Sequence, residues 1–83
     1  MSIDASVTLI EGRFVATLSD GRKIDQPYLR EFADALFVSG VNADDVSYQW
    51  SPGHRMITAG QQVALVAEIR QREDERDGLL IAA

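Results

Sequence analysis

The chain has 83 residues, a formal net charge of −5, and 46% apolar and 25% charged residues. This length and composition predict one globular domain over residues 1–83, and the lack of cysteine excludes disulfides and thiolate metal sites. The acidic balance argues against direct binding to nucleic acid, which requires a surplus of clustered Lys and Arg.

The sequence predicts neither a secretory signal nor a membrane-spanning segment. Residues 1–5 form a short lead without the basic and apolar regions of a secretory signal. The longest apolar run, residues 79–83, is far shorter than the ~20 residues that span a membrane. We therefore expect a cytoplasmic protein that does not bind membranes.

The first third of the chain has the pattern of a β-meander. Residues 6–10 and 14–18 are rich in β-branched and aromatic side chains, and Glu11-Gly12 between them suits a tight hairpin turn. A second turn at residues 19–21 leads into a short strand over residues 22–24.

A helix is expected after Pro27, where the apolar period changes. Over residues 28–40 the apolar side chains at 29, 32, 33, 36 and 37 form one stripe of a 3.6-residue helix. We expect Asp25 to cap its first turn and Gly40 to end it with a left-handed backbone.

The middle of the chain predicts a second hairpin. Residues 46–51 alternate between apolar and polar, Pro52-Gly53 suits a reverse turn, and residues 55–57 are expected to return as a strand. This places Tyr48 and Trp50 on one face of the hairpin.

The last helix is expected to begin at Thr58. With Gln61 it matches the capping box, and residues 63, 65, 66 and 69 supply the apolar side. Glu68 is placed to pair with Arg72 four residues later.

The end of this helix is predicted to be polar and to be followed by an apolar tail. Every residue from 70 to 77 is polar, so these turns should extend into water, and Gly78 is expected to end the helix. The tail, residues 79–83, then adds an edge strand to the protein's own sheet, buries Leu79, Leu80 and Ile81 in a second copy to form a homodimer, or stays exposed. Exposure is the least favoured of the three, because apolar residues in water need a cover.

The order of elements favours an α+β fold. We expect a small antiparallel sheet of four or five strands (a β-meander then a helix, a β-hairpin then a helix) with two helices packed on one face. The expected core consists of Val7, Leu9, Phe14, Ala16, Leu18, Leu29, Phe32, Leu36, Val46, Trp50, Ile57, Val66 and Ile69.

Residues 48–56 contain the side chains best suited to protein recognition. Trp, Tyr and Arg are enriched at interface hot spots because they bury much area and keep a polar handle. The candidate protein-binding residues are Tyr48, Trp50, His54, Arg55 and Met56. For Tyr48 and Trp50 the competing interpretation, burial inside the hairpin, is favoured, whereas His54 and Arg55 at the turn are expected to be exposed.

A second candidate binding surface is the acidic end of the last helix. Its carboxylates belong to Glu73, Asp74, Glu75 and Asp77. Three interleaved arginines dilute their field, so a solvated helix end with pairs such as Arg70–Asp74 is the competing interpretation.

One combination of residues suggests chemistry. Asp44, Asp45 and His54 would form a carboxylate–imidazole cluster if the second hairpin joined its strand ends. Their spacing matches no known ligand pattern. We therefore expect a solvated loop here, with no metal, no cofactor and no catalytic site.

Composition and these candidate sites together favour a non-enzymatic module that occupies the surface of a partner protein. Small size and acidity suit a stoichiometric inhibitor or regulator, such as a phage-encoded inhibitor of a host defence or nucleic-acid-binding protein. A basic partner would associate faster through charge complementarity. The alternative is a homo-oligomeric structural or assembly protein that uses the apolar tail.

Overall fold

The first three strands form an antiparallel meander. In the computed structural model, which describes residues 3–82 and the side chains of residues 3–76, these strands are β1 (Ala5–Ile10), β2 (Arg13–Leu18) and β3 (Lys23–Gln26). Ile10 pairs with Arg13, and the two turn residues between them have positive φ, 51° at Glu11 and 78° at Gly12. Such a left-handed pair matches the right-handed twist of a hairpin, and the predicted meander is confirmed.

Helix α1 (Leu29–Val38) buries the predicted stripe, with Phe32, Ala33 and Leu36 inaccessible to solvent. Gly40 follows it with φ of 94°, as predicted for the helix end. The predicted cap is wrong, because Asp25 lies in β3 and its carboxylate accepts a hydrogen bond of 2.7 Å from Arg13 Nε on β2. This cross-strand ion pair takes the carboxylate away from the helix.

Strand β4 (Val46–Tyr48) follows a 3₁₀ turn, η1 (Ala43–Asp45), and runs parallel to β1. Within residues 3–82 the sheet therefore has four strands in the order β3-β2-β1-β4, and it is mixed rather than antiparallel. The predicted second hairpin is wrong: residues 49–58 form a loop, and residues 55–57 form no strand. Ile57, only 1% exposed, is buried in the core instead of extending along the edge of β4.

Helix α2 (Ala59–Ala82) begins with the predicted capping box. The Gln61 N–H donates to Thr58 Oγ1 at 3.1 Å, and the Thr58 N–H donates to Gln61 Oε1 at 2.9 Å. The predicted end at Gly78 is wrong, since the helix continues through Ala82. One glycine in a helix costs only about 1 kcal/mol relative to alanine, which flanking helix-forming residues offset.

The continuation of α2 also corrects the interpretation of the apolar tail. Residues 79–82 are helical, so they do not form an edge strand of the sheet. The side chains of Leu79, Leu80 and Ile81 lie outside the described side chains, and their role in oligomerisation stays a prediction.

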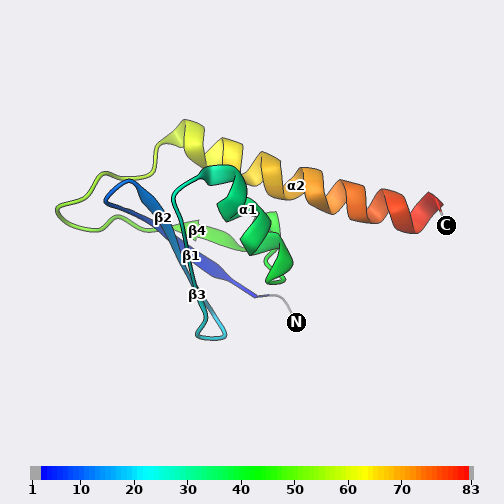
Figure 1. Ribbon diagram of the computed structural model, residues 1–83, viewed down its shortest axis with the longest axis horizontal. Helices are drawn as coiled ribbons and strands as arrows, with labels where there is room; N and C mark the ends of the chain where they lie inside the picture. The colour runs from blue at the N-terminus through cyan, green and yellow to red at the C-terminus, as the bar shows by residue number, and fades with distance from the viewer. Residues whose placement is uncertain (1–2, 83) are drawn as a thin grey trace.

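Both helices cover the same face of the sheet (Figure 1). Rings of Phe14 on β2 and Phe32 on α1 stack across this interface with their centroids 5.6 Å apart. The last turns of α2 extend past α1 and the sheet (Figure 1), in a molecule measuring 49 × 26 × 18 Å. Among the described residues no helix is long and apolar enough to cross a membrane. The α+β architecture with both helices on one face is confirmed.

The core agrees with the sequence-based expectation except at its margins. Leu29, Val46 and Val66 are half-buried and pack against the core, whereas Trp50 is 61% exposed, so its predicted burial is wrong. The fully or almost fully buried apolar residues are Ala5, Val7, Leu9, Phe14, Ala16, Leu18, Phe32, Ala33, Leu36, Val41, Ala43, Ile57, Leu65 and Ile69.

Replacing Phe32 by alanine tests how much α1 contributes to the core. Because the ring is fully buried against Phe14, Phe32→Ala should lower the free energy of unfolding by about 2–5 kcal/mol, measured by urea denaturation. Val38→Ala, on the exposed side of the same helix, should change it by less than about 0.5 kcal/mol. An unchanged denaturation midpoint for Phe32→Ala would contradict the packing of α1.

Candidate functional site

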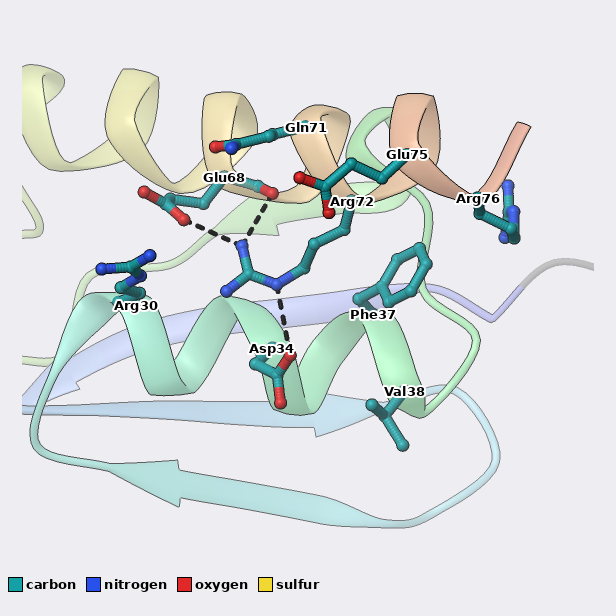
Figure 2. Close-up of a pocket in the computed structure, with 9 residues that line it drawn as sticks. All are labelled: Arg30, Asp34, Phe37, Val38, Glu68, Gln71, Arg72, Glu75 and Arg76. Carbon is teal, nitrogen blue, oxygen red and sulfur yellow. Dashed lines mark hydrogen bonds and ion pairs between the residues drawn. The ribbon is translucent and has the colours of Figure 1, made fainter. Parts of the chain in front are cut away.

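The cleft between α1 and α2 is built around one arginine, Arg72. Its Nε–H donates to Asp34 Oδ1 at 3.2 Å, and its Nη1–H donates to the carbonyl and the carboxylate of Glu68 at 2.9 and 2.8 Å (Figure 2). The hydrogen bond that Arg72 donates to the Glu68 carboxylate is the main cause of the raised pKa of Arg72. The predicted Glu68–Arg72 pair within α2 is confirmed. The same arginine also pairs with Asp34 of α1 and so connects the two helices.

A second contact between the two helices in this cleft is aromatic. The Arg76 guanidinium carbon lies 5.4 Å from the centroid of the Phe37 ring, within the range of a cation–π interaction (Figure 2). The cleft has a volume of about 400 Å³. Among the described residues no buried side-chain nitrogen or oxygen lacks a hydrogen-bond partner. Arg72, through Asp34, and Arg76, through Phe37, therefore connect α2 to α1.

The carboxylates of the predicted acidic surface differ in their burial and in their hydrogen bonds. Glu73 is half-buried, and its Oε1 accepts a hydrogen bond of 2.9 Å from the backbone N–H of Ala43 in η1. Asp74 and Glu75 are exposed, and the side chain of Asp77 lies outside the described side chains. Glu73 thus contributes to the attachment of η1, while Asp74 and Glu75 remain open to a partner.

Arg70 forms a different ion pair from the one predicted. Its Nη2–H donates to Asp44 Oδ1 at 2.6 Å, rather than to Asp74 one turn further along α2. Both side chains are more than half exposed, so the pair contributes little to stability. Asp44 and Asp45 of η1 consequently lie beside α2, next to the start of β4.

The loop of residues 49–58 extends beside the β1–β2 turn, at the end of the molecule opposite the C-terminus (Figure 1). In it Trp50 is 61% exposed, and its indole N–H donates to the carbonyl oxygen of His54 at 3.0 Å. The His54 N–H in turn donates to the Ser51 carbonyl at 3.0 Å. The tryptophan is therefore oriented by the backbone of its own loop instead of by burial.

His54 connects this loop to the hairpin turn. The backbone N–H of Glu11 donates to His54 Nδ1 at 3.4 Å. The depression between loop and turn has a volume of about 680 Å³. Its lining comprises Leu9, Glu11, Gly12, Phe14, Pro27, Gly53, His54, Arg55 and Gln61.

The predicted binding residues of this segment lie in two environments. Trp50, Arg55 and Met56 are exposed, and His54 is half-buried. Tyr48 is half-buried on β4, where its hydroxyl donates to the Gln62 carbonyl of α2 at 3.4 Å and burial raises its pKa. Tyr48 therefore attaches α2 to the sheet edge, and the loop residues are the ones open to a partner.

The three residues considered for a metal or acid–base cluster have separate partners. Asp44 pairs with Arg70, Asp45 accepts from the Asn42 amide at 3.5 Å, and His54 accepts from Glu11. Among the described residues no group of three or more His, Cys, Asp or Glu side chains is arranged to hold a metal ion.

Sequence reasoning missed an apolar groove between β4 and α2. It has a volume of about 440 Å³ and is lined by Tyr48, Gln62, Val63, Val66, Ala67 and Arg70. Val63 is 70% exposed, so the prediction that it shares the apolar side of the helix with Leu65 is wrong. Two residues turn an α-helix by about 200°, so Val63 and Leu65 point to opposite sides, and this spacing was the available signal.

Comparison with protein-family models, with curated proteins and with solved structures finds no match to this chain.

Removal of Arg72 should destabilise the protein more than removal of Arg70. Arg72→Ala takes the cation away from two carboxylates, one of them half-buried, and should lower the free energy of unfolding by about 1–3 kcal/mol. Arg70→Ala breaks an exposed pair and should cost about 0–1 kcal/mol. Equal losses in thermal denaturation of the two variants would contradict the structural role of the cleft.

Proposed function

We propose that this protein is a non-enzymatic module that binds a partner protein through the loop of residues 49–58, with Trp50 at the centre of the contact. The observation that carries the proposal is an exposed tryptophan that is hydrogen-bonded into a fixed orientation. A tryptophan side chain contributes about 150–250 Å² of contact area when a partner covers it. Because its indole is already oriented, binding loses little side-chain entropy.

The surroundings of Trp50 support a protein ligand. Met56 and Arg55 are exposed in the same loop, and both residue types are enriched at protein interfaces. The bond between His54 and the β1–β2 turn restrains the loop from one side, and the capping box of α2 restrains it where the helix begins. A loop restrained in this way presents its side chains with little cost of ordering.

The charge distribution supports a basic partner. The net charge is −5, and exposed carboxylates include those of Asp44, Asp74 and Glu75. Opposite charge on a partner would speed association. The biological role that we propose is that of a stoichiometric inhibitor or regulator, such as a phage-encoded inhibitor of a host defence or nucleic-acid-binding protein.

Affinity capture with matched variants tests this proposal. An N-terminally tagged full-length chain, incubated with nuclease-treated lysate of its native host, should retain one protein at near-equal stoichiometry. With that partner purified, Trp50→Ala should weaken binding by about tenfold or more in calorimetry. Tyr28→Ala removes another exposed aromatic side chain and should leave the affinity unchanged.

The variants should retain the fold, because both side chains are mostly exposed. Circular dichroism checks this before binding is compared. A partner that binds wild type and Trp50→Ala equally would refute the central role of the loop, and recovery of the bait alone would refute the binding module itself.

A homo-oligomeric assembly protein is the second candidate. The observation that favours it is the continuation of α2 through Ala82 beyond the sheet and α1, which puts residues 79–82 at the end of an extending helix (Figure 1). Light scattering separates the candidates. A binding module should be monomeric with and without residues 79–83, whereas an assembly protein should be a multimer that loses its subunit contacts on this deletion.

A further inference from the structure

Strand β4 has one free edge. It pairs with β1, and within residues 3–82 no strand lies on its other side. The Gln49 N–H donates to the Val7 carbonyl at 2.7 Å, and successive backbone groups of a strand alternate in direction. The N–H and C=O groups of Val46 and Tyr48 therefore point away from β1, where they can pair with another strand.

An apolar groove runs beside this free edge. Tyr48 of β4 lines one side, and α2 lines the other with Val63, Val66 and Ala67 and with the polar side chains of Gln62 and Arg70. A strand added to β4 would place every second side chain toward the helices. These alternate side chains would enter the groove and cover Val63, which is 70% exposed.

The two ends of the free edge differ in chemistry. Asp44 and Asp45 immediately precede β4, and the Asp44 side chain is 79% exposed. Arg70 pairs with Asp44, but an exposed pair of this kind contributes little and can be exchanged for another cation. At the other end, Trp50 follows β4 by two positions.

We propose that the partner binds by adding an extended segment to the free edge of β4, with apolar side chains at alternate positions in the β4–α2 groove and a Lys or Arg above Asp44 and Asp45. This inference rests on the proposed function, because it specifies which element of the partner lies next to the Trp50 loop. Strand addition obtains affinity from backbone hydrogen bonds and specificity from the pockets for alternate side chains. A second copy of the chain is a poorer occupant, since it also carries a charge of −5.

A designed peptide tests the free edge independently of any natural partner. The probe is fluorescein-labelled Lys-Lys-Val-Thr-Val-Thr-Val, titrated with the full-length protein and followed by fluorescence anisotropy. Replacing both lysines by glutamate should weaken binding by about fivefold or more, since opposite charges become like charges. Replacing the central valine by proline, which removes a backbone donor, should abolish binding at the concentrations used.

Two protein variants locate the bound peptide. Val63→Glu places a carboxylate in the groove and should weaken binding by about fivefold or more. Val38→Glu makes the same change at an equally exposed position of α1 and should have no effect. In amide hydrogen exchange, the N–H groups of Val46 and Tyr48 should exchange more slowly when the peptide is bound.

Three results would overturn strand addition. They are equal binding of the parent and proline peptides, unchanged exchange of Val46 and Tyr48 at saturation, and protection of these two amides by self-association in the absence of peptide. The proposed function fails separately. If Trp50→Ala abolishes partner capture and the peptide does not bind, the loop interface is supported and strand addition is refuted. If Trp50→Ala leaves partner capture unchanged and the peptide binds, only the loop interface is refuted.

Discussion

The fold depends on the burial of one face of the sheet. Along β1 and β2 the apolar side chains occur at alternate positions, so one face carries Val7, Leu9, Phe14 and Ala16 and the opposite face is more polar. Both helices must therefore lie on the same side, and the stacked rings of Phe14 and Phe32 join the layers. With α1 packed against β3 and α2, the flank of α2 comes to lie beside β4.

Polar contacts attach α2 where apolar packing ends. Leu65 and Ile69 anchor its first half in the core. Farther along, Arg72 binds Asp34 of α1 and Glu73 binds the backbone of η1, so charged side chains continue the attachment. These contacts explain why the charged segment of α2 after Ile69 stays packed against α1 and η1.

Both surfaces proposed for binding arise where the chain leaves the core. The loop of residues 49–58 crosses from β4 to α2, and only Ile57 within it is fully buried. Trp50 consequently lies on the surface, and β4 keeps a free edge because no strand within residues 3–82 returns beside it. The free edge and the exposed tryptophan therefore both follow from the path of residues 49–58, which form a loop instead of the second strand of a hairpin.

Local sequence determined the elements whose signals are local. The Glu11-Gly12 turn, the apolar stripe of α1, the left-handed Gly40 and the Thr58 capping box all depend on neighbouring residues, and each was predictable. Tertiary structure alone decided where β4 pairs, where Asp25 and Arg70 find their partners, and whether Trp50 is buried. The alternation of residues 46–51 is the same for a hairpin and for a parallel edge strand. The two arrangements differ in which side chain the core buries, and here it buries Ile57 and leaves Trp50 exposed.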